Sequence, residues 1–258
     1  MTNKAKSRFS KYAPFYDLLY EDKDYKAEAH FIADLIKDFK NDKKLTLLDA
    51  GCGTGIHAIE LSKLGYILEG SDISYEMIEI ARQKVKKTNY AVKFHNESFQ
   101  TLNNIKGRFD VILCMFSSIN YLTSLEDLDI FFQNVFSLLK KDGIFIFDFW
   151  NGEAVEKGFS KVRSKSAENN SMKIDRKSET SIDTKTQEVF LKFYFDLYEN
   201  NSLIDSFAEN HHLRYFFIQE MQNILSKNNL NFLFSCPFMD RESKICSDTW
   251  NISFVVKK

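Results

Sequence analysis

The chain has little of the chemistry that marks secreted, membrane-spanning or metal-stapled proteins. Of its 258 residues only four are cysteines and two are prolines. The cysteines show no C-x-x-C or other close pairing, which argues against a zinc site or a disulfide framework. No apolar run approaches the roughly 20 residues that a membrane-spanning helix needs, and the N-terminus has no signal-peptide core. We therefore expect a cytoplasmic protein without a metal site or a membrane contact.

The chain also lacks an excess of charge of either sign. Thirty-five basic and 36 acidic residues give a net charge of -1, so no global positive field favours a nucleic-acid partner. With 44% apolar and 28% charged residues, the composition is that of an ordinary globular protein. The length allows one large domain or two small ones.

Glycine is scarce except in one place. All nine glycines lie between residues 51 and 158, and three fall within the segment L-L-D-A-G-C-G-T-G, residues 47–55. This segment follows a predicted strand and opens a predicted helix, so we expect its backbone N–H groups to favour an anionic group. The missing side chains would let a cofactor lie against the main chain. The dinucleotide motif G-x-G-x-x-G would need glycine at position 56, which is Ile56.

Hydrophobic periodicity predicts strands that alternate with helices over the first 150 residues. Short apolar strands are predicted at 45–49, 66–72, 91–95, 110–116 and 144–149. Helices are predicted at 24–40, 56–64 and 74–87, and through Lys140 after a capping box of Thr123 and Glu126. This alternation predicts an α/β fold with a doubly wound parallel sheet, whose ligands bind at the carboxyl ends of the strands.

The alternation stops after residue 150. Residues 156–188 are mostly polar, whereas 189–197 and 208–216 read as strands, so we expect an antiparallel β insertion after the fifth strand. Residues 231–236 and 250–256 could form a closing hairpin and bring the main sheet to seven strands. The expected domains are an N-terminal helical lid (1–40), a core (41–150 and 216–258) and the insertion (151–215), which would contact substrate or a second copy.

The glycine segment resembles the first motif of class I S-adenosylmethionine-dependent methyltransferases. Asp49, Gly51, Gly53 and Gly55 match its acidic residue and G-x-G-x-G, and Asp72 matches the acidic residue that ends the second strand. The resemblance covers residues 12–149 and implies a Rossmann-like methyltransferase fold. It also implies S-adenosylmethionine as cofactor, with S-adenosylhomocysteine as product. Asp72 would bind the two ribose hydroxyls.

Further cofactor contacts follow from the same resemblance. They are Ile73 on the adenine face and the neighbouring positions Cys52, Met77, Phe99, Met115 and Phe116. The loop after the third strand departs from the family pattern, because Ser98 stands where an aspartate is usual. A serine hydroxyl can accept the same hydrogen bond, and Glu97 is the alternative.

Other segments resemble a small-molecule subgroup that methylates nucleotide-linked amino sugars. Tyr12 and Tyr16 match its Y-x-x-x-Y-D motif and either pack on the sheet or close over the cofactor's sulfonium. Tyr121 matches a position that faces the substrate amine. The remaining matches and rim positions are Glu209, His211 and Arg214 of E-x-H-x-x-R-Y-F, and Asp148, Trp150 and Asn151 at the end of the fifth strand. The first three would pair internally or hold a polar ligand.

The resulting hypothesis is direct S_N2 transfer of a methyl group to an amine or hydroxyl of a small molecule. Alignment would supply most of the catalysis, with Tyr121 or His211 accepting a proton from a hydroxyl acceptor. The protein would be a monomer, or a homodimer through the insertion. Two alternatives stay open: a non-catalytic module that binds S-adenosylmethionine, and a nicotinamide-dependent oxidoreductase, which Ile56 disfavours.

Overall fold

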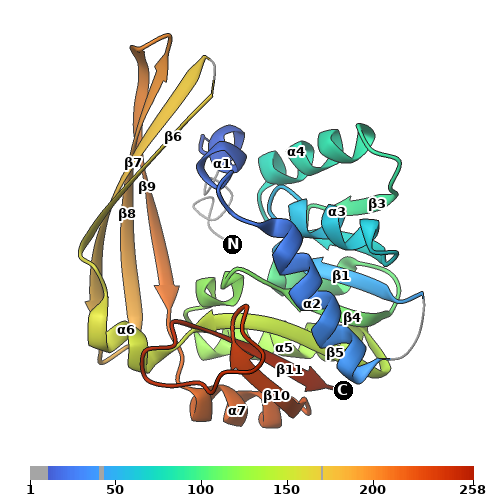
Figure 1. Ribbon diagram of the computed structural model, residues 1–258. Coiled ribbons are helices and arrows are strands. Elements are labelled where there is room, and N and C mark those ends of the chain that lie inside the picture. The colour runs from blue at the N-terminus through green and yellow to red at the C-terminus, as the bar shows by residue number, and fades with distance from the viewer. Residues whose placement is uncertain (1–10, 41–43, 170) are drawn as a thin grey trace.

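The computed structural model describes residues 11–40, 44–169 and 171–258. Its strands form a seven-stranded sheet in the order β10-β11-β5-β4-β1-β2-β3 and a four-stranded sheet in the order β6-β7-β8-β9. The smaller sheet stands beside the larger unit, with α1 between them (Figure 1). Residues 1–10 of the predicted lid, 41–43 of the predicted core and residue 170 of the predicted insertion lie outside the described residues.

The large sheet has the predicted architecture. β1 to β5 pair in parallel, whereas β11 pairs antiparallel with both β5 and β10. The prediction of a mostly parallel, seven-stranded sheet is therefore confirmed. Its strands are β1 (Thr46–Ala50), β2 (Ile67–Ser71), β3 (Val92–His95), β4 (Phe109–Cys114), β5 (Leu139–Trp150), β10 (Asn231–Pro237) and β11 (Asn251–Lys257).

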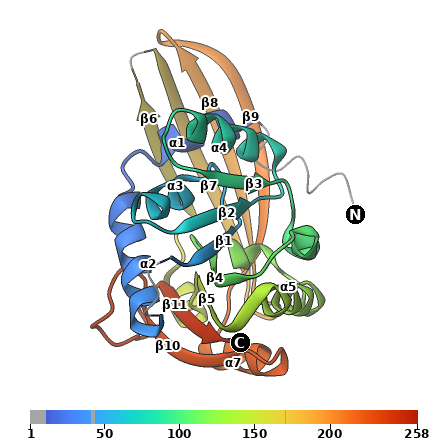
Figure 2. The same ribbon diagram turned by 90° about the vertical axis from the view of Figure 1, so that its right-hand side faces the viewer.

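Helices cover both faces of this sheet, as Figure 2 shows. Leu48 and Ile112 belong to one buried cluster, and their neighbours Leu47 and Val111 belong to another. Because successive side chains of a strand point to opposite faces, burial on both faces explains the continuous apolar runs. The covering helices are α2 (Tyr25–Phe39), α3 (Ile56–Lys63) and α4 (Tyr75–Lys86) on one side, and α5 (Leu125–Leu138) and α7 (Ile218–Lys227) on the other.

The start of α5 differs from the prediction. The expected capping box of Thr123 and Glu126 does not form. Instead Ser124 is the N-cap, and its hydroxyl accepts a hydrogen bond of 3.0 Å from the backbone N–H of Asp127. Both pairs have the same spacing, and Ser124 has the extended backbone that an N-cap requires, so the helix begins one residue later.

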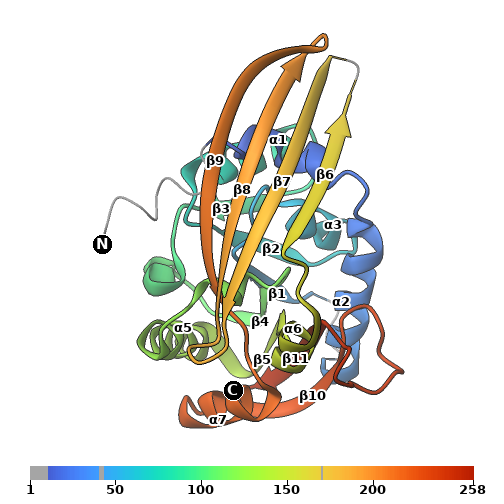
Figure 3. The same cartoon turned by 90° about the vertical axis from the view of Figure 1, so that its left-hand side faces the viewer.

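The insertion is a four-stranded antiparallel sheet of β6 (Val162–Glu168), β7 (Met172–Asp183), β8 (Glu188–Glu199) and β9 (Ser202–Arg214), preceded by α6 (Gly152–Gly158). The four strands lie side by side in Figure 3. The insertion itself is confirmed, but the sequence predicted only β8 and β9. β6 and β7 lie within the polar segment 156–188, where buried residues such as Ile174 are too widely spaced to show a strand pattern.

One face of the small sheet packs on the N-terminal segment. Phe195 and Leu197 of β8 and Ile174 of β7 form a buried cluster with Tyr12 and with Leu19 of α1 (Ala13–Leu19). This contact joins the insertion to the segment that precedes the large sheet. Within the described residues no helix is long and apolar enough to cross a membrane.

Candidate functional site

The glycine loop between β1 and α3 has the backbone geometry that only glycine adopts without strain. Gly51, Gly53 and Gly55 have φ values of 79°, 53° and 77°. A Cβ atom on Gly55 would come within 2.7 Å of the Phe94 ring, so Gly55 permits close packing. A Cβ atom on Gly53 would meet nothing within 4 Å. The space above Gly53 is therefore the part of the loop that a ligand can approach.

The N–H groups of the same loop are already used within the fold. Those of Gly51 and Cys52 donate to the carbonyl of Ser71, at 2.7 and 2.9 Å, and that of Gly53 donates to the carboxylate of Asp72 at 2.9 Å. These three N–H groups precede α3 (Ile56–Lys63), so the expectation that the N–H groups at the helix N-terminus favour an anion stays a prediction. What the glycines themselves offer a ligand is the open surface above Gly53.

Asp72 stands at the carboxyl end of β2, next to the loop. Its second carboxylate oxygen accepts a hydrogen bond of 2.8 Å from the N–H of Ser74. Each oxygen has a second lone pair, so Asp72 can fix the loop and still accept from a ligand's hydroxyl. Ile73, which follows it, is an exposed apolar side chain, whereas Met77 one helical turn further is buried. The carboxylate of Asp72 and the exposed apolar side chain of Ile73 are thus adjacent.

The loop after β3 brings the two alternative adenine contacts close together. The Ser98 hydroxyl lies 3.1 Å from the Thr101 hydroxyl and belongs to the cap of a short 3-10 helix. Glu97 accepts from Asn104 at 3.1 Å. Both side chains keep lone pairs for a further bond, so the choice between them stays open. Phe99 lies beside the glycine loop, because its ring is 3.2 Å from where a Cβ of Gly51 would be.

Asp49 at the end of β1 is the most unusual carboxylate of the loop. It is 1% exposed, and its Oδ2 atom has no hydrogen-bond partner among the described residues. Burial raises its pKa to about 6. It lines a cavity of about 40 Å³ with six other residues of the predicted set, Tyr16, Gly51, Cys52, Gly53, Met115 and Phe116, and with six further residues. A buried carboxylate without a partner suits a cationic or hydrogen-bonding ligand group.

Lys23 enters this cavity, and the sequence reasoning missed it. Its ammonium lies 2.8 Å from a carboxylate oxygen of Glu28 and 3.7 Å from the centroid of the Phe116 ring. Burial lowers the pKa of Lys23, and Glu28 opposes this effect. The available signal was a lysine three residues after the last tyrosine of an aromatic-rich segment. It is a cation held beside the loop.

A strained turn after β4 presents Phe116 to the cavity. Phe116 and Ser117 have φ values of 60° and 55°, which are uncommon for residues with side chains. Asp148 of β5 holds this turn, because its carboxylate accepts from the Ser117 N–H at 3.0 Å and from the Ser117 hydroxyl at 2.9 Å. Asp148 is fully buried, so the expectation that it lies at the rim is wrong. Asp148 therefore affects the cavity only by holding the turn that carries Phe116 and Ser117.

Tyr121, His211 and Glu209 form a chain of polar contacts between the two sheets. The Tyr121 hydroxyl lies 2.8 Å from His211 Nδ1, and His211 Nε2 lies 3.6 Å from a carboxylate oxygen of Glu209. Tyr121 comes from the short 3-10 helix after β4 (Ser118–Tyr121), and the other two from β9. Residues 90 positions apart are thus joined, a contact that the sequence did not predict, since its two motifs offered Tyr121 and His211 only as alternative proton acceptors. The Tyr121–His211 contact can pass a proton between phenol and imidazole, while the Glu209 carboxylate is close enough to act on the imidazole by charge.

Arg214 does not join this chain, contrary to the expected cluster of Glu209, His211 and Arg214. It pairs with Glu220 and donates to Gln187 at 2.8 Å. The reason is strand alternation: residues 209 and 211 point to one face of β9, and residue 214 is out of phase with them.

Two further predicted residues also have partners within the fold. Asn151 is buried and donates to the carbonyls of Cys246 and Thr249. Trp150 lies in an aromatic group with Phe159 and Trp250, whose ring centroids are 5.8 and 6.1 Å away. Both residues therefore support the junction between β5 and the insertion, next to the site.

The two tyrosines of the N-terminal segment lie in different places. Tyr16 lines the cavity, and its ring centroid is 4.8 Å from that of Tyr20. Tyr12 is buried and stacks on Phe195 of the small sheet at 4.8 Å. Burial raises the pKa of both phenols well above the usual value, so both stay protonated at neutral pH. Packing is therefore observed for Tyr12, whereas closure of Tyr16 over a cofactor stays a prediction.

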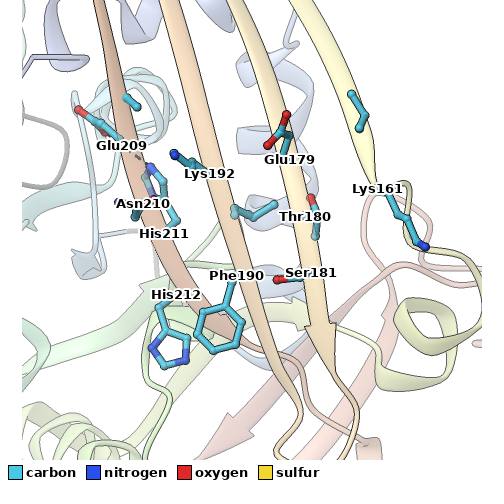
Figure 4. A pocket seen from close by; sticks show the side chains of 13 residues that line it. Lys161, Glu179, Thr180, Ser181, Phe190, Lys192, Glu209, Asn210, His211 and His212 are labelled. Atoms are coloured by element: carbon cyan, nitrogen blue, oxygen red, sulfur yellow. Dashed lines mark ion pairs between the residues drawn. The ribbon is translucent and has the colours of Figure 1, made fainter.

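A larger hollow, of about 870 Å³, lies on the small sheet (Figure 4). Its lining comes wholly from residues 161–212, so it is separate from the cavity at the glycine loop. Phe190 and His212 project from two neighbouring strands and stack with centroids 4.6 Å apart. Their face of the sheet is available for contacts away from the glycine loop.

Comparison with known proteins agrees with this geometry. Residues 47–143, which run from the glycine loop to the turn inside β5, match the sequence profile of a family described as a methyltransferase domain. Residues 47–143 are thus similar to a methyltransferase domain. The described fold also resembles an S-adenosylmethionine-dependent methyltransferase from Clostridium acetobutylicum, with a TM-score of 0.82 and 24% identity over 96% of this chain and 98% of that one. The resemblance therefore extends beyond the methyltransferase domain to the insertion.

Two curated relatives are similar in sequence to about half of this chain. One is the dTDP-3-amino-3,6-dideoxy-alpha-D-glucopyranose N,N-dimethyltransferase of Streptomyces fradiae, 31% identical over 54% of this chain and 52% of its own length. The other is a glycine/sarcosine N-methyltransferase of Aphanothece halophytica, 32% identical over 48% of this chain and 48% of its own. The chain thus spans about half the length of these relatives.

Proposed function

We propose that the chain transfers a methyl group from S-adenosylmethionine to an amine or hydroxyl of a small molecule and releases S-adenosylhomocysteine. The observation that carries this proposal is a juxtaposition at the carboxyl ends of β1, β2 and β4. The open surface of Gly53, the unpartnered oxygen of Asp49 and the Tyr121–His211 pair lie at that edge. Open parallel sheets bind ligands there.

The residues of the loop fit the parts of this cofactor. When bound, S-adenosylmethionine supplies a methyl group already activated on a sulfonium. Asp72 would accept hydrogen bonds from the ribose hydroxyls, Ile73 would lie against adenine, and Ser98 or Glu97 would accept from its amino group. Lys23 is the cation available to the carboxylate of the methionyl part, and Asp49 is the anion available to its ammonium. The rings of Tyr16 and Phe116 attract positive charge.

The chain's own contribution to the reaction is alignment and proton handling. Tyr121 orients the acceptor's nucleophilic atom, and His211 takes its proton through the 2.8 Å contact. Glu209 stabilises the charged imidazole that results. Holding two reactants in line can lower a barrier by several kcal/mol, up to about 11. The names of both relatives specify methylation of nitrogen, and this supports an amine, including that of a nucleotide-linked sugar, as the first acceptor to test.

The test uses cofactor labelled with deuterium in its methyl group. Purified protein is incubated with it and with a panel of amino sugars, amino acids and phenols, and mass spectrometry detects labelled products. Labelled product that requires protein supports the proposal. Binding of the cofactor without product from any acceptor would favour the binding-module alternative, and no binding at all would overturn both. Monomer or homodimer, a cytoplasmic location and the lack of a nucleic-acid partner stay predictions, the first of which sedimentation velocity can test.

A further inference from the structure

Arg176 of β7 differs from the other arginines that the structure describes. Arg82, Arg214 and Arg241 each pair with a carboxylate. The other two, Arg108 and Arg163, are exposed, so water solvates them. Arg176 is partly buried and has no carboxylate within ion-pair distance among the described residues, and its Nε atom is buried without a hydrogen-bond partner.

The surroundings of Arg176 are aromatic. One guanidinium nitrogen donates to the Tyr20 hydroxyl at 3.1 Å, and the guanidinium carbon lies 4.9 Å from the centroid of the Phe193 ring. The Tyr12 hydroxyl also interacts with Arg176, but two phenols and a ring face compensate a positive charge only in part. A buried arginine usually has an anion as partner, because removing its charge from water is costly. The missing anion is therefore the feature that needs an explanation.

The position of Arg176 connects it to the proposed reaction site. Tyr20, its hydrogen-bond partner, has its ring 5.4 Å from that of Phe116 at the cavity of the glycine loop. Phe193, its stacking partner, has its ring 4.7 Å from His211. Arg176 is thus one aromatic ring away from the cofactor cavity and one aromatic ring away from the proton-handling pair.

We propose that Arg176 binds an anionic group of the methyl acceptor, so that the acceptor is an amine or alcohol carrying a carboxylate or a phosphate. The planar guanidinium can hold either group through two parallel hydrogen bonds, and the buried Nε is one of the donors that such a fork uses. The acceptor's nucleophilic atom would then lie at Tyr121 and His211, and its anionic group at Arg176. The ring of Phe193 lies between these two positions. This proposal rests on the proposed methyl transfer and specifies its substrate class.

The direct test measures binding and does not require turnover. Protein saturated with S-adenosylhomocysteine is titrated by calorimetry with three probes: sarcosine, which carries a carboxylate, sodium pyrophosphate, which carries phosphate, and ethanolamine, an amine without an anion. We expect wild type to bind sarcosine or pyrophosphate and to bind ethanolamine at least tenfold more weakly. The probe that binds distinguishes a carboxylate acceptor from a phosphate acceptor.

Two variants assign the binding to this residue. Arg176→Gln should weaken binding of the preferred anion at least tenfold, while Arg163→Gln, which removes an exposed arginine of the neighbouring strand β6, should leave it unchanged. If Arg176→Gln does not fold, Arg176→Lys keeps the charge, loses the fork and should bind several-fold more weakly than wild type. Melting curves identify which variant is usable.

The failures of the two proposals are distinguishable. If the protein binds S-adenosylhomocysteine and methylates a neutral amine but neither anion binds, the role of Arg176 is wrong and the proposed function stands. Equal anion affinity in wild type and in a folded Arg176 variant overturns the role as well. If S-adenosylhomocysteine itself does not bind, the proposed function fails first.

Discussion

The two sides of the candidate site are built by different means. The cofactor side depends on the backbone: three glycines with positive φ shape a loop, and one of them, Gly53, leaves an open surface. The acceptor side is a matter of side chains, because β6 to β9 contain no glycine and present Glu209, His211 and Arg176 from regular strands. The backbone geometry of the loop depends on a short contiguous motif, which can be recognised in the sequence. The side chains of the acceptor side come from paired strands whose residues are far apart in the sequence.

The largest expected effect comes from a substitution in the glycine loop, which forms the cofactor side of the site. Gly53→Val should abolish binding of S-adenosylmethionine, more than 100-fold by calorimetry, because its side chain enters the open surface and its φ of 53° strains a branched residue. Gly65→Val is the matched control, since Gly65 also has positive φ and open space but ends α3 away from the loop. Normal binding by a folded Gly53→Val protein would show that the loop is not the cofactor site.

The next effect removes the carboxylate that serves both loop and ligand. Asp72→Ala should weaken cofactor binding about 100-fold or more, because two hydroxyls lose a charged acceptor worth about 1.5 to 3 kcal/mol each. It should also lower the melting temperature, since the N–H groups of Gly53 and Ser74 lose their partner. Glu69→Ala is the control, because this carboxylate of the same strand bonds His95 instead. Unchanged affinity in a folded Asp72→Ala protein would remove Asp72 from the site.

A third prediction concerns stability and pH on the backbone side. Burial raises the pKa of Asp49 from 3.8 to about 6, so the folded protein holds its proton more tightly than the unfolded chain does. Stability through this group is therefore lost as pH rises from about 4 to 6, by about 3 kcal/mol. Asp49→Asn should raise the free energy of unfolding at pH 7.5, and the gain should shrink toward pH 4, while cofactor binding weakens.

Asp148 provides the control for that experiment. Burial raises its pKa to about 6 as well, but its carboxylate accepts from Ser117 and Asn251. Asp148→Asn should therefore destabilise the protein, because an amide cannot accept all of these bonds. Urea unfolding at pH 4, 6 and 7.5 measures both variants. A gain for Asp49→Asn that is the same at each pH would contradict the explanation by burial of charge.

The same contrast explains what the sequence could and could not predict. The glycine loop and the mostly parallel seven-stranded sheet follow from a contiguous motif and from hydrophobic periodicity. The Tyr121–His211 contact was not predicted, because it joins two motifs that lie far apart in the sequence. β7 was missed because Ile174 and Ser178 are its fully buried positions among charged neighbours, so no continuous apolar pattern marks the strand. Arg214 was assigned to the wrong cluster because a nearby sequence position does not give the face of a strand. Lys23 and Arg176 were missed because their chemistry depends on aromatic partners from distant segments.

The smallest expected effect concerns Tyr121, a residue of the acceptor side. Tyr121→Phe keeps the ring but removes the hydroxyl that lies 2.8 Å from His211 Nδ1. If Tyr121 orients the acceptor and passes its proton to His211, kcat should fall about tenfold, as for one lost hydrogen bond of about 1 to 1.5 kcal/mol, with little change in cofactor affinity. If the tyrosine only packs, the variant should match wild type.

A double-mutant cycle with His211→Gln separates these two roles. When both side chains act on one proton, the second substitution adds little to the first, so the losses are not additive. Two independent packing contacts would give additive losses instead. The acceptor found in the labelling experiment is used for all four proteins. Equal kcat/KM for wild type and Tyr121→Phe from pH 6 to 9 would exclude the proton-handling role and leave Arg176 as the defining residue of the acceptor side.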